Sequence, residues 1–168
     1  PVVINEIHYH PPEGQESFIE LLNNTDAAVA LYDPAFPTNR WKLGGGVSFT
    51  FPANLSLAAG DCLIVVDFDP ANVAALSAFR SRHGIAPNVP VFGPFSGKLA
   101  NDEDPVELYK PDTPQHPPNP DAGFVPYVLV DRVRYISTPS DHLMLALLIA
   151  IASSNFKRVP PPTRNGAT

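Results

Sequence analysis

The sequence predicts a single all-β sandwich domain with one short helix. Its 168 residues are enough for one hydrophobic core, which is the default for a chain of this length. Short runs of apolar and β-branched residues recur along the chain, and clusters of turn-forming residues separate them. The 21 prolines are about two and a half times the average share, which favours short strands joined by many turns.

Six strands are expected from these runs. They are Val2 to Tyr9, Phe18 to Asn23, Val47 to Phe51, Asp61 to Val66, Pro105 to Lys110 and Val125 to Tyr135. Successive side chains of a strand point to opposite faces of its sheet. We therefore expect Ile19 and Leu21 to lie on one face of the second strand and Phe18 on the other.

One helix is expected between the fourth and fifth strands. Asp69 can cap its start, and Pro70 suits the first helical position. The apolar side of this helix would be formed by three residues at helical spacing, Val73, Leu76 and Phe79. Gly84 can end the helix. We expect the helix to cover one open end of the sandwich.

Two proline-rich segments are expected to lie outside the core. The segment Pro111 to Gly123 has five prolines and no apolar periodicity, so we interpret it as an extended, mobile surface loop between two strands. Residues 160–166 have the composition of an interdomain linker. We therefore place the domain at residues 1–159 and a linker or tail at residues 160–168.

The most hydrophobic segment of the chain is Leu143 to Ala152. Its ten residues are about half the length that a membrane span needs, so no membrane span is expected. A buried strand, a short core helix and an exposed partner-binding patch are all compatible with it, and burial is favoured. Self-assembly, either through an open sheet edge or through this segment as an exposed patch, is a third possible function.

The charge of the chain argues against two classes of partner. Its net charge is −6 and its pI is about 5.2. A surface with this balance has no positive field with which to neutralise phosphates. We therefore expect no nucleic-acid binding and no attraction to anionic membranes.

Two groups of residues were considered as metal ligands. His8 and His10 are spaced to share one strand face beside Glu6, but two histidines without a third ligand are a weak zinc signal. Two acidic turns offer oxygen atoms for calcium, and they contain Asp67, Asp69, Asp102, Glu103 and Asp104. Neither turn follows the calcium-loop pattern with its glycine and distal glutamate. We interpret both groups as turn residues and assign no metal ligand.

No catalytic residue and no cofactor site is assigned either. Gly44 to Gly46 opens no helix and no lysine-serine pair follows it, so it is interpreted as a hairpin connection and not as a phosphate loop. Cys62 lies in an apolar run and is expected to be a small buried residue without a nucleophilic role. Trp41 is expected in the core. No motif of a serine hydrolase or a zinc protease occurs.

Charged residues recur within three of the predicted strands. Glu6, Glu20, Arg132 and Arg134 have opposite signs on different strands. A charged recognition face is one reading of these residues. We favour the other reading, which is that they form ion pairs between strands and contribute a few tenths of a kcal/mol each.

Several segments resemble bacterial lamin tail domains in both order and spacing. They are Val3 to Pro12, Phe18 to Leu21, Trp41 to Pro52, Leu57 to Val66, Gly93 to Asn101, Val106 to Leu108 and Val130 to Tyr135. The resemblance covers residues 2–136. Beyond it, the family usually continues through a tryptophan-proline, glycine-rich turn into a final strand. Here Leu143 to Ala152 intervenes, and only Asn155 to Val159 resembles that strand.

The resemblance implies an immunoglobulin-like β-sandwich without catalytic residues. Bacterial lamin tail domains are appended to exported or surface proteins, so we expect an extracellular or cell-surface location and covalently linked neighbouring domains. The chain begins at Pro1 with no initiator methionine or signal peptide, so we also expect it to be a piece of a longer product.

The expected function is that of a non-catalytic interaction, adhesion or spacer module with a protein or polymer partner. The alternative is an accessory domain of an extracellular hydrolase that binds calcium or a polymer substrate. Under the first reading, the binding surface would be an exposed sheet face or the loops at one end, with Pro111 to Gly123 as a contributor.

Overall fold

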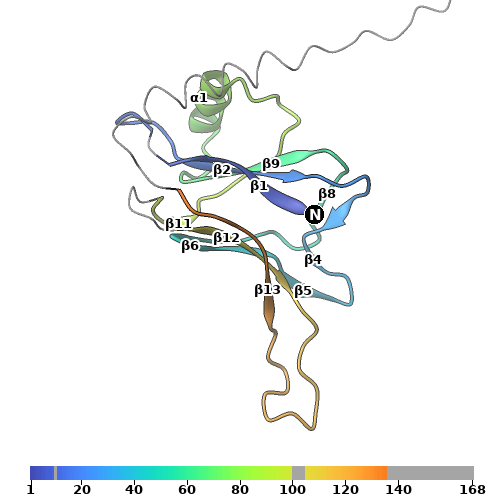
Figure 1. The fold of residues 1–168 in the computed structure, drawn as a ribbon. Coiled ribbons are helices and arrows are strands. Elements are labelled where there is room, and N and C mark those ends of the chain that lie inside the picture. Colours follow the sequence, from blue (N-terminus) through green and yellow to red (C-terminus); the bar gives the residue numbers. More distant parts are fainter. Residues whose placement is uncertain (10, 100–104, 136–168) are drawn as a thin grey trace, which may run out of the picture. The chain divides into compact units, whose positions relative to one another are not determined.

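The structure, a computed structural model, describes residues 1–9, 11–99 and 105–135. Within the compact unit Pro1–Ile136, two β-sheets face each other and one helix lies outside them (Figure 1). The predicted all-β sandwich with one short helix is therefore confirmed. The predicted boundary between residues 159 and 160 lies outside the described residues and stays a prediction.

The first sheet has four strands in the order β1–β2–β9–β10. They are β1 (Val2–His8), β2 (Phe18–Asn23), β9 (Cys62–Val66) and β10 (Val91–Phe92). Neighbouring strands are antiparallel except β10, which runs parallel to β9. Parallel neighbours need a crossover connection, and the helix α1 (Val73–His83) lies within it.

The second sheet has five antiparallel strands in the order β11–β7–β6–β12–β13. They are β6 (Lys42–Gly45), β7 (Val47–Thr50), β11 (Ser96–Gly97), β12 (Val106–Pro111) and β13 (Tyr127–Val133). Two short pairs lie outside the large sheets. They are β3 (Val29–Ala30) with β8 (Ser56–Leu57), and β4 (Tyr32–Asp33) with β5 (Phe36–Arg40).

The main core lies between the two sheets. Ile19 and Leu21 of β2 are fully buried in it, as their alternation predicts. Trp41 also packs there with 7% of its surface exposed, which confirms its predicted core position. Leu43 and Leu108 are buried in the same core from the opposite sheet, so both sheets contribute to one apolar layer.

A second, smaller core lies between α1 and the outer face of the first sheet. It contains Phe18, Ile64, Val66 and Phe79. Strand β9 is therefore covered on both faces, which explains why its sequence is continuously apolar. The prediction that the helix covers an open end of the sandwich was wrong. The helix covers the outer face of the sheet because Phe18, Ile64 and Val66 point there.

The start of α1 also differs from the prediction. Its N-cap is Asn72, whose side chain accepts a hydrogen bond from Ala75 N at 3.2 Å. Asp69 instead accepts from Ala71 N at 2.9 Å in the turn before the helix. With the start displaced, Val73 is 77% exposed and only Phe79 of the predicted apolar side is buried. Gly84 ends the helix in a left-handed conformation, as predicted.

Asn23, at the end of β2, is a fully buried polar residue. Its side-chain amide donates to the carbonyl oxygens of Ala27, Leu57 and Ala58 at 2.8–3.0 Å. Its side-chain oxygen accepts from the Thr25 hydroxyl at 2.7 Å. Asn23 therefore joins the end of β2 to the segment that contains β8, and it supplies the hydrogen bonds that a buried polar group requires.

All six predicted strands are present, each within two residues of its expected bounds. Seven further strands of the described chain were not predicted, and five of these are only two residues long. A two-residue pair is too short to show periodicity, so the sequence gives no signal for it. No helix among the described residues is long and apolar enough to cross a membrane. The segment Leu143 to Ala152 lies outside the described residues.

Candidate functional site

The connection between β12 and β13 projects beyond the sandwich as an arm, which we define as residues 112–126 (Figure 1). Backbone hydrogen bonds cross the arm, from Asp112 N to Pro126 O at 2.9 Å and from Gln115 N to Phe124 O at 2.8 Å. The predicted surface loop between two strands is therefore confirmed. It is not structureless, because these bonds continue the hairpin toward its tip.

Three large apolar side chains are exposed on the arm and the strand that follows it. Phe124 is 62% exposed, Val128 41% and Leu129 43%. Phe36 and Val73 are the other large hydrophobic residues exposed in the described part of the chain. Isolated exposed apolar residues are ordinary, whereas three that are close in sequence on one projecting hairpin are candidate contact residues, with Val128 and Leu129 on opposite faces of β13.

Strand β13 is an edge strand within the described part of the chain. It pairs with β12, and no other described strand is its neighbour in the sheet. The pairing of β12 with β13 is irregular at one point. Leu108 pairs with Asp131 and Tyr109 with Leu129, so Val130 has no partner in β12 and forms a bulge. Such a bulge bends and twists a strand. The bend and the twist at this bulge interrupt the flat strand edge, which would otherwise favour unspecific pairing with strands of other chains.

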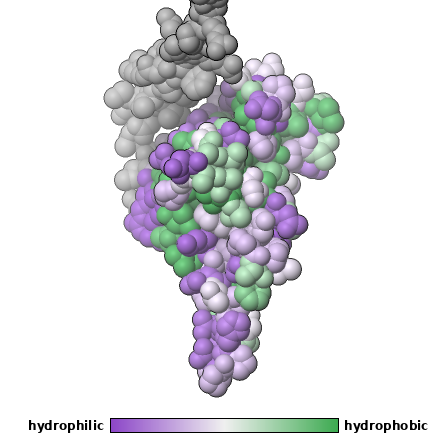
Figure 2. All heavy atoms as spheres, turned by 90° about the vertical axis from the view of Figure 1, so that its right-hand side faces the viewer, coloured by the Kyte–Doolittle hydropathy of each residue, from purple (hydrophilic) through white to green (hydrophobic). Residues whose placement is uncertain are grey.

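The surface of the arm is mainly polar. Figure 2 shows that the lower end of the molecule, where the arm lies, is mainly hydrophilic on the face in view, with only small hydrophobic patches. A few apolar anchors within a polar rim are typical of non-obligate protein interfaces. The arm therefore has the composition of a contact element and not that of a buried core.

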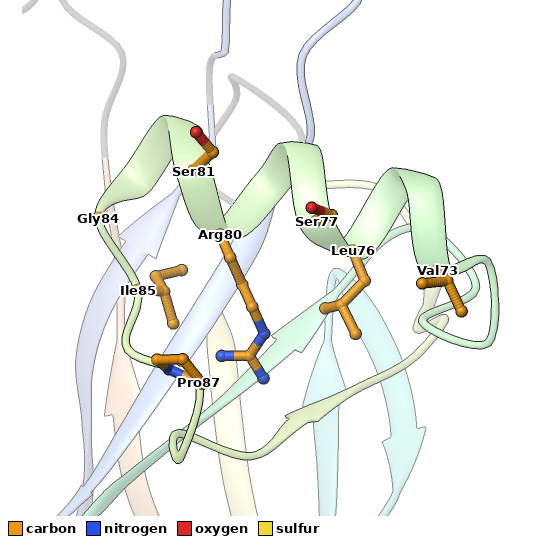
Figure 3. A pocket seen from close by; sticks show the side chains of 8 residues that line it. All are labelled: Val73, Leu76, Ser77, Arg80, Ser81, Gly84, Ile85 and Pro87. Atoms are coloured by element: carbon orange, nitrogen blue, oxygen red, sulfur yellow. The ribbon is translucent and has the colours of Figure 1, made fainter.

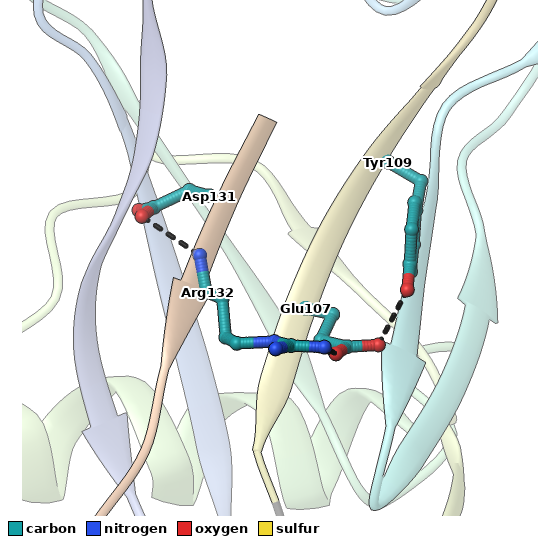
Figure 4. A network of polar contacts seen from close by, with 4 residues as sticks. All are labelled: Glu107, Tyr109, Asp131 and Arg132. Carbon is teal, nitrogen blue, oxygen red and sulfur yellow. Dashed lines mark hydrogen bonds and ion pairs between the residues drawn. The ribbon is translucent and has the colours of Figure 1, made fainter. Parts of the chain in front are cut away.

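A polar network covers the outer face of the second sheet, toward the end of β12 and β13 that lies away from the arm (Figure 4). The Glu107 side chain accepts from the Tyr109 hydroxyl at 2.6 Å and from Arg132 Nε at 2.7 Å, and it forms an ion pair with the Arg132 guanidinium. The Tyr109 hydrogen bond, together with Arg132, lowers the pKa of Glu107. The same hydrogen bond raises the pKa of Tyr109. The network therefore holds an ionised carboxylate between β12 and β13.

Lys42 extends the outer face toward the arm. Its ammonium lies 3.7 Å from the centroid of the Tyr127 ring and 5.9 Å from that of Tyr109. A Cβ atom at Gly44 would approach the Tyr109 ring to 2.9 Å, so glycine is required for the ring to lie against β6. The predicted hairpin connection at Gly44 to Gly46 is confirmed in part, since β6 and β7 form a hairpin but the first two glycines belong to β6.

Asp131 connects strand β13 to the other sheet. Its Oδ2 accepts from Ile4 N of β1 at 2.8 Å, and its Oδ1 accepts from Arg132 N at 2.8 Å. Figure 4 shows Asp131 pointing toward β1 and Arg132 extending toward Glu107. Consecutive residues of β13 therefore hold this strand to β1 on one side and to β12 on the other.

The predicted ion pairs between strands have other partners. Glu6 lies opposite Glu20 across β1 and β2, and burial together with Glu20 raises the pKa of Glu6. Arg132 is paired with Glu107 instead. The prediction was wrong in its pairing because β1 and β2 belong to one sheet and β13 to the other. The sequence pattern alone does not show which strands are neighbours.

His8, one of the considered metal ligands, lies at the end of β1 in an aromatic cluster. Its ring stacks on Phe18 at 5.0 Å and meets His83 of α1 edge-on at 5.4 Å. His10 lies outside the described residues. Among the described residues, no group of three or more histidine, cysteine or acidic side chains is placed to hold a metal ion.

The acidic turn after β9 has structural roles. The Asp67 carboxylate accepts from Ser17 N at 2.9 Å, and Asp69 accepts from Ala71 N. The Asp69 carboxylate thus fixes the turn before α1, whereas that of Asp67 joins the end of β9 to the residue before β2. The second acidic turn, at residues 102–104, lies outside the described residues.

Cys62 is half-buried, whereas the sequence predicted a buried residue. The difference arises because β9 begins at Cys62, at the edge of the core. Burial, together with the neighbouring Glu20, raises the pKa of its thiol to about 11. The thiolate is the nucleophilic form of cysteine. The side chain is therefore almost entirely in its unreactive thiol form near neutral pH.

A shallow groove of about 470 Å³ lies beside α1 (Figure 3). Leu76 and Ile85 line it, and the Arg80 side chain extends from the helix into it. The Arg80 guanidinium donates to the carbonyl oxygens of Ala86 and Val89. Arg80 therefore fastens the segment after the helix, and its hydrogen bonds serve the fold.

The chain matches no protein-family model, no curated protein and no solved structure.

Proposed function

We propose that this chain is a non-catalytic interaction module, and that the arm with strand β13 is its binding element. The observation that carries the proposal is the exposure of Phe124, Val128 and Leu129 on a projecting hairpin. The resemblance to bacterial lamin tail domains supports an adhesive or spacing role in a larger exported protein. The partner would be a protein or polymer at the cell surface.

The construction of the arm suits such a role. Its backbone hydrogen bonds limit the motion of the arm, and the Asp131 connection to β1 holds the strand that follows it. A surface that is already ordered loses less conformational entropy on binding, so more of the contact energy appears as affinity. Aromatic anchors usually contribute most to such interfaces. Phe124 is therefore the residue on which binding should depend most strongly.

A comparison of variants tests the proposal. The variant carries Phe124→Ser and Leu129→Ser, and the control is Val73→Ser, which removes an exposed apolar residue from α1. Each purified chain is immobilised and exposed to envelope extract and cell-wall polymer from bacteria, and retained material is quantified.

We expect the wild type and Val73→Ser to retain the same material. The arm variant should retain at least tenfold less of it, which corresponds to a loss of about 1.4 kcal/mol in binding free energy. Equal unfolding curves of the three chains would show that the fold is intact. The proposal is wrong if the arm variant retains the same material as the wild type.

A further inference from the structure

Two histidines from different elements meet where α1 contacts the first sheet. His8 ends β1, and His83 is the last residue of α1. Besides its contact with His8, the His83 ring lies 5.1 Å from Phe18 and 5.0 Å from Phe79. Four rings from β1, β2 and α1 thus form one aromatic cluster at the C-terminal end of the helix.

Both imidazoles have a buried nitrogen without a hydrogen-bond partner. These atoms are His8 Nε2 and His83 Nε2. Buried polar atoms in proteins are nearly always paired, so two neighbouring exceptions need an explanation. A neutral imidazole loses one hydrogen bond in this position, whereas a protonated one would bring a full charge into the same apolar surroundings.

The charged groups around the cluster do not compensate such a charge fully. Glu16, from the connection between β1 and β2, favours protonation of both histidines, but it is already paired with Arg82 of α1. Arg82 itself opposes protonation of His83. From β2 and β9, the side chains packed under α1 are Phe18, Ile64 and Val66, which do not titrate.

We propose that His8 and His83 form a proton-sensitive latch, which holds the C-terminal end of α1 on the sheet when both rings are neutral and releases it in acid. Protonation of one ring places a charge among aromatic rings, and protonation of the second adds repulsion between the two. Release of the helix exposes the apolar outer face of β2 and β9. Acid thus converts a covered face of the module into an adhesive one.

The direction of the pH dependence follows from burial. Burial lowers the pKa of both histidines in the folded state, and His83 lowers the pKa of His8 further, as Arg82 does for that of His83. The stabilising contribution of the neutral rings is therefore complete above the ordinary histidine value of 6.5 and is lost as the pH falls through the lower folded-state values. The latch should open in mildly acidic conditions and not in alkaline ones.

Hydrogen exchange of the whole chain tests the latch. Amide protection is measured between about pH 7.5 and about pH 5, where histidines titrate and ordinary carboxylates stay ionised, and is corrected for intrinsic exchange rates. The variant is His8→Phe with His83→Phe, which keeps the rings and removes the titration. The matched control is His116→Gln, because His116 lies on the arm.

In the wild type and His116→Gln, we expect acid to remove protection from the α1 amides while the β2 amides keep theirs. The phenylalanine variant should keep α1 protected at both pH values. NMR titration of the wild-type imidazoles gives a readout that needs no variant, because the His8 and His83 signals should shift over the pH range in which α1 loses protection. Unchanged α1 protection in acid, or an equal loss in the phenylalanine variant, would overturn the proposal.

Discussion

Replacement of Glu107 by glutamine should destabilise the protein at neutral pH and have little effect in acid. Glu107 is 7% exposed and accepts hydrogen bonds from the Tyr109 hydroxyl and from Arg132. Glutamine has nearly the same shape but carries no charge. The substitution therefore isolates the charge of the carboxylate from its packing.

The structure sets the size of the effect. Hydrogen bonds to a charged group contribute about 1.5–3 kcal/mol each when they are buried. The Arg132 side chain is 43% exposed, so solvent screens its share to the level of a surface pair, about 0.5 kcal/mol. Glutamine can still hydrogen-bond the Tyr109 hydroxyl, so only the difference between a charged and a neutral hydrogen bond is lost there, about 1 kcal/mol. We therefore expect Glu107→Gln to lower the free energy of unfolding by about 1.5 kcal/mol near neutral pH.

The difference in unfolding free energy between the wild type and Glu107→Gln should depend on pH. The folded-state pKa of Glu107 is lower than its ordinary value of 4.5, so its contribution is complete above that value and is lost as the pH falls through the folded-state value. Protonated glutamate and glutamine are then nearly equivalent. The two unfolding free energies should therefore converge in acid.

Urea unfolding followed by fluorescence measures this difference, because Trp41 is the one tryptophan of the chain and is buried in the main core. Glu13→Gln is the control, since Glu13 is exposed and its substitution should change stability by less than about 0.5 kcal/mol. A deficit of Glu107→Gln that is the same at neutral and acid pH would refute the role assigned to the charge.

Two further predictions concern residues of the first sheet. Asn23→Ala should cost about 3 kcal/mol in urea unfolding because three carbonyl oxygens lose their donor, whereas Asn24→Ala, at an exposed position, should cost less than about 0.5 kcal/mol. Equal costs would contradict the structure around Asn23. Alkylation of Cys62 should be slow at neutral pH and accelerate up to about pH 11, the pKa of its thiol, and rapid labelling of the folded chain near pH 7 would show that this thiol is not shielded.

The longer strands could be predicted because their signal is local. Alternation identified β2, and a continuous apolar run identified β9. That run also contained evidence for a second covered face, since a strand buried on both sides has no polar side. The run does not show which element covers that second face, so the helix was expected over an open end of the sandwich.

The candidate site depended on information that a single sequence does not contain. Glu107 and Arg132 meet because β12 and β13 pair in one particular register, with these two residues opposite each other. Likewise, His8 meets His83 only through the packing of α1 on the sheet. Exposure of Phe124 was not predictable either, because an aromatic residue after a proline-rich loop could equally begin a buried strand.

Photo-crosslinking from position 124 tests the central claim most directly. Phe124 is replaced by benzoylphenylalanine in one chain and Val73 in another, and both chains are illuminated with bacterial envelope extract. An interaction module that binds through the arm should form a discrete adduct from position 124 and none from position 73. Adducts from neither position, or the same adducts from both, would contradict binding through the arm.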